Sequence, residues 1–175
     1  MTIWAIRQTP GTFGNLLRAR YLAPRMKSAG SNLTVMAGCR FRSIRNLEVG
    51  DNVTIGFDNF IQARGGVRIG SNVGLGPGVQ IWSVSREHSD PDAAAIEQGK
   101  GHKPVVIENN VFIASNAFVL PGATIPEGCI VSAGAVVGGT AYHPFSILGG
   151  NPARIIGYRG GRSPAQEVEG EQRIL

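Results

Sequence analysis

Three histidines, His88, His102 and His143, are the side chains of this sequence best suited to proton transfer near neutral pH. Two acidic residues, Asp90 and Asp92, follow the first of them closely. A neutral imidazole can remove the proton of an attacking hydroxyl group, and this help is worth roughly 10²–10⁴ in rate. A zinc site built from three histidines needs two of them close together in the sequence. Here the successive histidines are 14 and 41 residues apart, which argues against such a site.

His88 lies in a polar segment at 83–103 that has no periodicity of its own. Connections of this length are uncommon in a compact domain and usually carry function. The segment also contains Arg86 and Asp90, and it ends in Lys103. We therefore expect the chemistry of this protein at the inserted loop.

The two cysteines, Cys39 and Cys129, are too few for a disulfide framework and do not form a CxxC pair. Cys129 belongs to a column of small residues described below, which predicts core packing rather than nucleophilic reactivity. Nothing indicates export, because the first fourteen residues lack the apolar core of a signal peptide and no apolar run could cross a bilayer. We expect a cytoplasmic protein.

Composition narrows the fold class. The chain has 175 residues, 42% hydrophobic and 17% charged, which fits one folded domain and excludes a disordered protein. Its 25 glycines and 10 prolines exclude a helical bundle and favour short strands joined by tight turns. The net charge of +5 fits an anionic partner and equally a solvated basic surface. No recognition motif indicates nucleic acid, so we expect none as a partner.

A six-residue repeat dominates the second half of the sequence. It consists of an aliphatic column, a column of small or β-branched residues four positions later, and a turn column one position before the small one. The columns are Ile107, Ile113, Val119, Ile125, Val131 and Val137; Val111, Ala117, Ala123, Cys129 and Ala135; and Asn110, Asn116, Gly122, Gly128 and Gly134. A helix needs a period of 3.6 and a strand a period of 2, so a period of six predicts short strands separated by corners. Three units complete a triangular coil, and stacked coils pair as parallel strands.

The same period appears upstream in two shorter runs. They are Val49, Ile55 and Ile61, then Ile69, Leu75 and Ile81. The eight-residue step between the runs predicts a bulge or widened corner at 64–68, and Leu33 and Cys39 are the earliest positions that fit the pattern. We expect an all-β solenoid of four to six coils. The expected organisation is an N-terminal basic cap at 1–32, the solenoid at 33–158 with the inserted loop at 83–103, and a tail at 159–175.

Residues 13–28 predict a short basic amphipathic helix that ends near Ala23, just before Pro24. Leu17 and Tyr21 are spaced i, i+4, and arginines lie between the apolar residues. Two roles stay open for this helix. It either caps the open end of the solenoid or docks peripherally on the inner membrane face or on a lipid-linked glycan.

The most specific motifs lie late in the repeat: Leu-Pro-Gly-Ala-Thr-Ile at 120–125, Ser-Ala-Gly-Ala-Val-Val at 132–137 and Gly-Asn-Pro-Ala-Arg at 150–154. With these motifs the chain resembles the hexapeptide-repeat acyltransferases. Its loop, which returns through Gly-His-Lys-Pro-Val at 101–105, is similar to that of sugar and maltose-type O-acetyltransferases. The resemblance implies a left-handed parallel β-helix, a homotrimer, and transfer of an acetyl group from acetyl-CoA to a sugar hydroxyl. The basic N-terminal segment is similar to that of transferases in exopolysaccharide or lipopolysaccharide biosynthesis.

His88 is the general base that the resemblance implies, oriented by Asp90, Asp92 or a backbone carbonyl. Asn59 is a candidate donor to the oxyanion, because it occupies an inward position that small apolar residues normally fill. The alternative for Asn59 is a structural bond at a corner. Arg86 and Asp90 are expected to contact the sugar.

The cofactor residues also follow from the resemblance. Ala114, Ser132 and Ala133 are expected along the pantetheine arm, where Ala114 replaces the glycine that family members usually carry. Arg154 and Lys103 are expected at the phosphates, with Arg159 and Arg162 as lesser candidates.

Two other functions stay open at this point. One is a non-catalytic solenoid that serves as a scaffold or glycan-binding module. The other is a zinc enzyme like the γ-class carbonic anhydrases, against which the histidine spacing argues. We expect no metal. The sequence does not identify the acceptor sugar, its hydroxyl, or the length of the acyl group.

Overall fold

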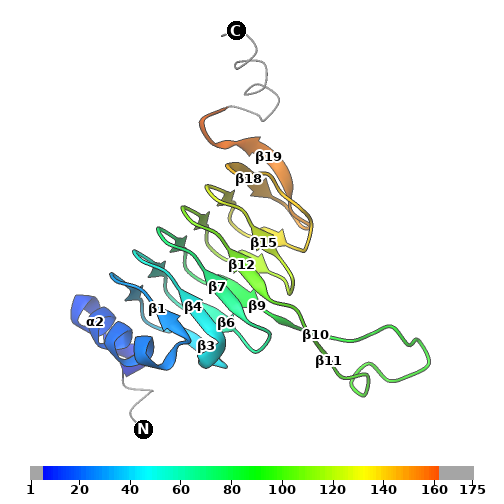
Figure 1. Cartoon of the computed structure of the whole chain (residues 1–175), viewed down its shortest axis with the longest axis horizontal. Helices are drawn as coiled ribbons and strands as arrows, with labels where there is room; N and C mark the ends of the chain where they lie inside the picture. Colours follow the sequence, from blue (N-terminus) through cyan, green and yellow to red (C-terminus); the bar gives the residue numbers. More distant parts are fainter. Residues whose placement is uncertain (1–5, 162–175) are drawn as a thin grey trace.

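The computed structural model describes residues 6–161, which form a three-sided solenoid of parallel strands (Figure 1). Five complete coils stack along one axis, and a further strand begins a sixth before the chain turns back. Helix α2 (Gly11–Leu22) covers one end, and a long hairpin projects from the side. The all-β parallel solenoid predicted from the repeat is confirmed.

Each side of the solenoid is a sheet to which every complete coil contributes one strand. The first face contains β1 (Ser28–Ala29), β4 (Leu47–Val49), β7 (Val67–Ile69), β12 (Val105–Ile107) and β15 (Thr124–Ile125). The second face contains β2 (Thr34–Val35), β5 (Thr54–Ile55), β8 (Gly74–Leu75), β13 (Phe112–Ile113), β16 (Ile130–Val131) and β18 (Ser146–Gly149), with β19 (Arg154–Tyr158) antiparallel to β18. The third face contains β3 (Arg40–Arg42), β6 (Phe60–Gln62), β9 (Gln80–Trp82), β14 (Phe118–Val119) and β17 (Val136–Val137).

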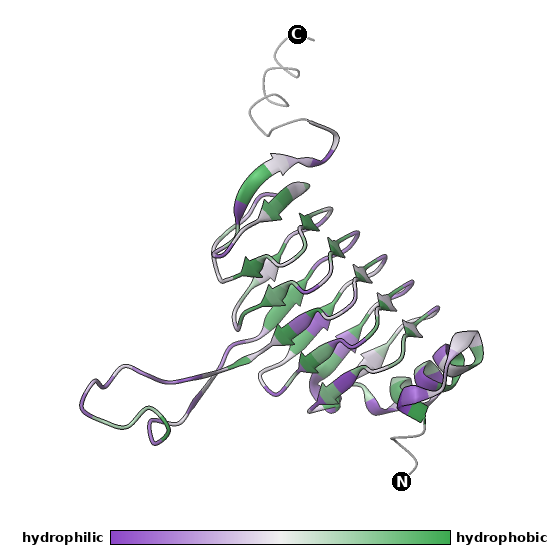
Figure 2. Cartoon of the chain, turned by 180° about the vertical axis from the view of Figure 1, so that it is seen from behind, coloured by the Kyte–Doolittle hydropathy of each residue, from purple (hydrophilic) through white to green (hydrophobic). Residues whose placement is uncertain are grey.

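The interior is filled by the columns that the repeat predicted. All eleven members of the aliphatic and small columns are buried, with exposed fractions of 0–1%. The five members of the turn column have φ between 58° and 83°, the left-handed region that asparagine and glycine adopt most readily. The two upstream runs are buried as well. Apolar packing inside the tube therefore holds the coils together, and Figure 2 shows the apolar residues along its strands.

The first coil begins at β1, five residues before the start at 33 that the sequence indicated. Ser28, Glu48 and Arg68 are register neighbours at intervals of twenty residues, whereas Val106 and Thr124 are eighteen apart. The early coils therefore carry two extra residues each at one corner. The first coil was missed because two of its inward positions hold Ala29 and Phe41 in place of valine, isoleucine or leucine.

The corner between the third and first faces, here called the hairpin edge, carries the length variation. In the first coil it holds a 3₁₀ turn, η2 (Ile44–Asn46). In the second coil it is a turn in which the Gly66 N–H donates to the Ala63 carbonyl at 2.9 Å, which confirms the widened corner predicted there. In the third coil residues 83–104 leave the solenoid at this corner, yet β7 and β12 still pair in continuous register.

Helix α2 contacts β2 and is followed by a 3₁₀ turn, η1 (Ala23–Arg25). The predicted helix is confirmed, and its fully buried positions are not its apolar residues. Phe13 and Leu16 are exposed, whereas Gly14 and Arg18 are buried.

The reason for this orientation is the open end of the first coil. Strand β2 is the last of its sheet and pairs with β5 on one side only, so its outward-facing Val35 carbonyl has no neighbouring strand to bond. Arg18 supplies donors instead: its Nε donates to the Val35 carbonyl at 2.8 Å, and its Nη1 donates to the Ile6 carbonyl at 3.0 Å. The same Nη1 donates to Thr9, and Nη2 donates to Asn15. Burial lowers the pKa of the Arg18 guanidinium from its ordinary value.

At the other end, the chain reverses at 150–153 and returns as β19 along β18. The 3₁₀ turn η3 (Arg159–Gly161) closes the described part of the chain. Arg162 and most of the expected tail lie outside the described residues. Within residues 6–161, no helix has the length and apolarity that crossing a membrane requires.

Candidate functional site

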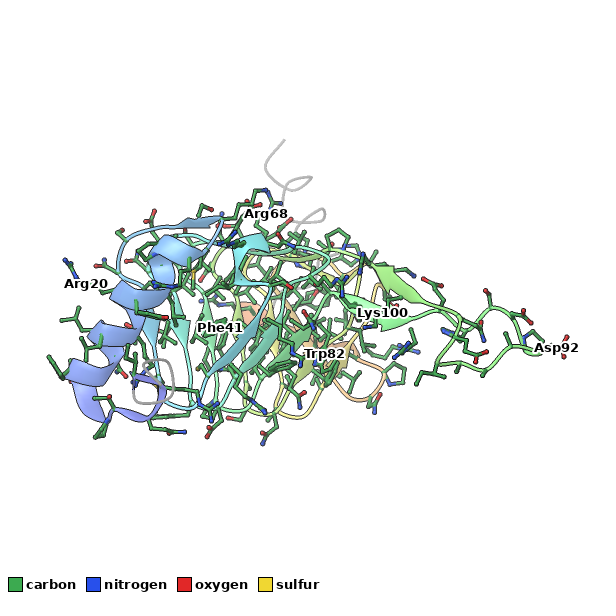
Figure 3. The ribbon with its side chains drawn as sticks, turned by 90° about the horizontal axis from the view of Figure 1, so that it is seen from below. Arg20, Phe41, Arg68, Trp82, Asp92 and Lys100 are labelled. Atoms are coloured by element: carbon green, nitrogen blue, oxygen red, sulfur yellow. The ribbon has the colours of Figure 1, made fainter. Side chains whose placement is uncertain are left out.

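The segment expected to carry the chemistry is a hairpin that extends away from the solenoid. Strands β10 (Val84–Arg86) and β11 (Lys100–His102) pair antiparallel, with Val84 opposite His102. Figure 3 places Asp92 at the far end of the hairpin, and Figure 2 shows that most of the hairpin is hydrophilic. The two short strands were not predicted, because the segment has neither alternation nor an apolar anchor.

Ser83 fixes the base of the hairpin. It is fully buried, its Oγ donates to the Gln62 carbonyl at 2.7 Å and accepts from the Gly65 N–H at 2.9 Å. The Ser83 carbonyl accepts from the Lys103 N–H at 3.0 Å, which ties the two ends of the insertion together. The signal for this residue was its place two positions after Ile81, on the inward side of an alternating strand.

The His88 ring is exposed, and its Nδ1 lies 3.1 Å from the backbone carbonyl oxygen of Arg86. A carbonyl oxygen only accepts hydrogen bonds, so we assign the proton to Nδ1 and a free lone pair to Nε2. This tautomer suits a general base that acts through Nε2. Of the orienting groups predicted for His88, the backbone carbonyl is the one in contact with the ring.

The two aspartates organise the loop instead. The Asp90 carboxylate accepts from the Asp92 N–H at 2.9 Å, and Gln98 bonds the Asp90 backbone on both sides. Arg86 also spans the loop, because its Nη1 donates to the Ile96 carbonyl at 2.9 Å. The expected contacts of Arg86 and Asp90 with a sugar stay predictions, since both side chains are exposed but already bonded within the hairpin.

Asn59 lies inside the solenoid with no exposed surface. Its Nδ2 donates to the Gly56 carbonyl at 2.9 Å and to the Gly76 carbonyl at 3.1 Å, so both amide hydrogens are used at the corners of two successive coils. This side chain has no donor free for an oxyanion and no access to a substrate. We therefore leave Asn59 out of the proposed site; of the two sequence interpretations, the geometry favours the corner bond.

Three of the expected cofactor residues lie together on a second edge of the solenoid. This Ala114 edge consists of the corners between the second and third faces at 114–117 and 132–135. The Ala114 N–H donates to the Val131 carbonyl at 2.8 Å, so the corner stacks directly below Ser132 and Ala133. Ala133 is exposed and the other two are half-buried.

The two basic residues expected at the phosphates lie elsewhere. Arg154 begins β19 at the C-terminal end of the second face, exposed, with Nη1 donating to the Ala153 carbonyl at 3.1 Å. Lys103 lies at the hairpin edge and packs over Gly122 of the next coil. The structure thus groups Ala114, Ser132 and Ala133, and it separates His88 from them by placing the hairpin on a different edge.

An aromatic row on the third face was missed at the sequence level. The Trp82 ring lies 5.3 Å from the Phe60 ring and 6.1 Å from the Phe118 ring, centroid to centroid. The Arg40 guanidinium lies 5.3 Å from the Phe60 ring. Each aromatic residue directly precedes or follows a buried anchor, which is the signal that could have found the row. It forms a half-buried apolar surface next to Ser83 at the hairpin base.

The cysteines are core residues. Cys129 is fully buried, as its column predicted, and burial raises the pKa of its thiol. Burial raises the pKa of the Cys39 thiol to about 11. The backbone carbonyl of His143 accepts a hydrogen bond from the Ser146 hydroxyl at 2.7 Å, at the turn that leads into β18. The described residues contain no group of three histidine, cysteine or acidic side chains that could hold a metal ion.

A tube of parallel strands built on a six-residue repeat, with a histidine-bearing hairpin inserted in one corner, has the architecture of hexapeptide-repeat acyltransferases. Residues 104–139 match the bacterial transferase hexapeptide family (six repeats), which confirms the resemblance predicted from the sequence. No curated protein matches the chain by sequence.

Several solved structures share the fold. A maltose O-acetyltransferase from Clostridium difficile 630 is 26% identical, with a TM-score of 0.75 over 88% of this chain and 80% of its own. A hexapeptide-repeat acetyltransferase from Vibrio cholerae O1 biovar eltor, in complex with acetyl coenzyme A, is 24% identical with a TM-score of 0.77 over 91% and 82%. A galactoside acetyltransferase in complex with coenzyme A is 24% identical with a TM-score of 0.79 over 89% and 76%. Together with the repeat, these similarities support an acyltransferase.

Proposed function

We propose that this chain is an acetyl-CoA-dependent O-acetyltransferase that modifies a sugar hydroxyl. The observation that carries the proposal is the His88 ring, exposed on a hairpin of an acyltransferase solenoid with Nδ1 bonded to a carbonyl. The similarity to structures crystallised with coenzyme A or acetyl coenzyme A supports an acyl-CoA donor. The similarity to maltose and galactoside acetyltransferases supports a sugar acceptor.

In the proposed reaction, Nε2 of His88 accepts the proton of the sugar hydroxyl as its oxygen attacks the thioester carbonyl. The new carbon–oxygen bond forms, the carbon–sulfur bond breaks, and the coenzyme A thiolate leaves with the proton that His88 returns. Positive charge on the ring during the transfer is stabilised by the Arg86 carbonyl at Nδ1. No acyl-enzyme is required, because donor and acceptor react directly when they are held together.

The site is completed by a second copy of the chain. The hairpin edge and the Ala114 edge are different edges of one tube, so one chain alone does not join its base to its expected cofactor residues. Extended chain from Ser83 to His88 reaches on the order of 15 Å, enough to meet a neighbouring tube. We propose a homotrimer in which each hairpin faces the Ala114 edge of a neighbour.

In this arrangement the pantetheine arm passes Ala114, Ser132 and Ala133, where small side chains allow close approach to the backbone. Arg154 pairs with a phosphate of the cofactor, and Lys103, which comes from the hairpin edge, approaches the same cofactor from the other chain. Arg86 and Asp90 on the hairpin contact the acceptor. We place the reaction in the cytoplasm, within cell-surface polysaccharide biosynthesis.

The direct test is an acceptor screen with acetyl-CoA, read as release of free thiol. We expect saturable acetyl-CoA binding and thiol release that depends on an added sugar. Release without an acceptor would contradict sugar transfer. Failure to bind acetyl-CoA would favour the non-catalytic scaffold, and stoichiometric zinc in the purified protein would favour the carbonic-anhydrase-like alternative.

Mixed assemblies test the shared site. At acetyl-CoA concentrations well below its dissociation constant, His88→Ala and Arg154→Ala chains are each expected to be weakly active alone, but co-expressed chains place an intact hairpin against an intact cofactor edge. Random assembly should restore about a quarter of wild-type activity. No recovery in assemblies proven to be mixed would put the whole site within one chain.

A further inference from the structure

A cavity of about 310 Å³ lies at the helix-capped end of the solenoid, away from the hairpin. Leu22 lines it from α2, and Phe41 and Ile44 line it from the first coil. Its surface is mainly apolar, and its volume is at the lower end of the roughly 300–1,000 Å³ of small-molecule sites. None of these residues has a part in the proposed acetyl transfer.

Four arginines line the same cavity, and no acidic residue does. They are Arg7, Arg18, Arg25 and Arg40. Within residues 6–161 the ion pair found is that of Lys27 with Glu48, so none of the four arginines meets a carboxylate within 4.0 Å. Burial and, to a lesser extent, the nearby acidic residue Asp58 raise the pKa of Cys39, which lines the cavity, but Asp58 itself does not line it.

Three of these arginines keep charge available for a ligand. Arg18 is fully engaged with backbone carbonyls and Asn15. By contrast, Nε of Arg7 is buried without a hydrogen-bond partner. The Arg25 guanidinium lies 3.6 Å from the Tyr21 ring centroid and donates to the Tyr21 carbonyl, and Arg40 lies over an aromatic ring. The buried Nε of Arg7 would otherwise stay without a hydrogen-bond partner, and the exposed guanidinium groups of Arg25 and Arg40 add positive charge with no carboxylate beside it, so this site favours an anion.

We propose that this cavity binds an anionic amphiphile from a membrane. The apolar chain lies against Leu22, Phe41 and Ile44, and a phosphate or carboxylate head lies among Arg7, Arg25 and Arg40.

The outer side of α2 fits this source. Phe13 and Leu16 are 68% and 65% exposed, and Figure 3 shows Arg20 pointing away from the solenoid. Exposed apolar and basic side chains on one helix are typical of contact with an anionic membrane surface. The helix would rest on the membrane while the cavity behind it takes one lipid.

Binding of dodecyl phosphate to the full chain, by calorimetry below its critical micelle concentration, tests the cavity. We expect one site per chain, and at least about tenfold weaker binding of inorganic phosphate and of neutral dodecyl maltoside, because both the chain and the charge are required. Absence of dodecyl phosphate binding, or equal binding of the neutral detergent, would overturn the assignment.

Variants locate the site. Arg25→Glu with Arg40→Glu should weaken dodecyl phosphate binding at least about tenfold. Arg64→Glu with Arg68→Glu, the same charge change at two exposed positions outside the cavity, should leave it within about twofold. Ile44→Trp, which keeps every charge but fills the cavity, should abolish binding. Equal losses in Arg64→Glu with Arg68→Glu would mean that binding reflects net charge alone and would overturn the proposal.

Vesicles test the membrane source. The wild-type chain should sediment with phosphatidylglycerol vesicles and not with phosphatidylcholine vesicles, and Arg20→Glu should weaken sedimentation while leaving dodecyl phosphate binding intact. Dodecyl phosphate binding without sedimentation would overturn the membrane source and leave a free amphiphile as the ligand. Acetyl transfer is measured separately with soluble sugars, so either proposal can fail without the other.

Discussion

The stacked coils and the inserted hairpin use their residues in opposite ways. In the coils, each hexad sends an aliphatic side chain into a continuous core, and the corners close on asparagine or glycine. In the hairpin at 83–103, Ser83 at the base is the buried residue, while His88 and the acidic residues are exposed. The comparison teaches that stability resides in the tube and the proposed chemistry in the hairpin. The two should therefore respond to different mutations.

The largest expected effect breaks the tube. Ile113→Ala removes a fully buried side chain from the fourth coil and should lower the free energy of unfolding by about 3 kcal/mol. Its neighbour Phe112 is 48% exposed, so Phe112→Ala is the matched control and should change the free energy by less than about 1 kcal/mol. Denaturant unfolding at one fixed protein concentration measures both. Equal losses would mean that the outer face contributes as much as the core.

The second prediction breaks the hairpin without touching the tube. His88→Ala should lose at least about 100-fold in turnover, because no other group takes the acceptor proton. Its acetyl-CoA affinity and melting temperature should stay nearly unchanged. His102→Ala, an exposed imidazole on the same hairpin, serves as the control and should stay within a few-fold of wild type. Turnover of His88→Ala close to wild type would remove His88 from the mechanism.

The third prediction uses pH to probe the tube. The pKa of Cys39 rises from an ordinary 9.0 to about 11, chiefly by burial, and its Sγ donates to the Gly56 carbonyl at 3.0 Å. Between these values the unfolded chain has lost a proton that the folded chain keeps. Stability that is fully present below pH 9 is therefore lost as pH rises through 11. This loss should be on the order of 2 kcal/mol.

Cys39→Ala isolates this contribution. Other groups also titrate in alkaline solution, so the comparison is between the pH dependences of the two proteins from pH 8 to 11. We expect the variant to be less stable at pH 8 and to lose less as the pH rises. Parallel pH profiles would contradict the shifted thiol.

The smallest expected effect tests whether the cofactor binds away from the hairpin edge, as proposed. Arg154→Ala should weaken acetyl-CoA binding by about five- to tenfold, through loss of one phosphate contact. Calorimetry measures this affinity, with Arg68→Ala on the first face as a control that should bind normally. An unaltered dissociation constant would refute the assignment of Arg154.

The solenoid was predictable because buried aliphatic residues recur every six positions in the sequence. One buried anchor per hexad, from Ile107 to Val137, leaves few other ways to bury apolar side chains. The corner at 64–66 followed from a single eight-residue step. The first coil was less visible because its anchors Ala29 and Phe41, although six residues from Val35, are not the valine, isoleucine or leucine that marks the other coils.

The parts that were not predictable depend on contacts between distant residues. Burial of Arg18 follows from carbonyls at the open end of the tube, which no local pattern reveals. The sequence left Asn59 open between a donor to the oxyanion and a corner bond, and the choice depends on the Gly56 and Gly76 carbonyls of two successive coils, which accept both of its amide hydrogens. The histidine was predicted by type and place, but its orientation by the Arg86 carbonyl required the hairpin geometry.

The hairpin edge has a wider consequence for how such a protein can change. Three successive coils turn this corner with a 3₁₀ turn, a tight turn and an excursion over residues 83–104, and the strands on either side keep their pairing throughout. Insertions at this corner therefore leave the strand pairing of the solenoid unchanged. Natural variation, or a designer grafting a loop with another acceptor preference, could alter specificity at this position while the scaffold keeps its register.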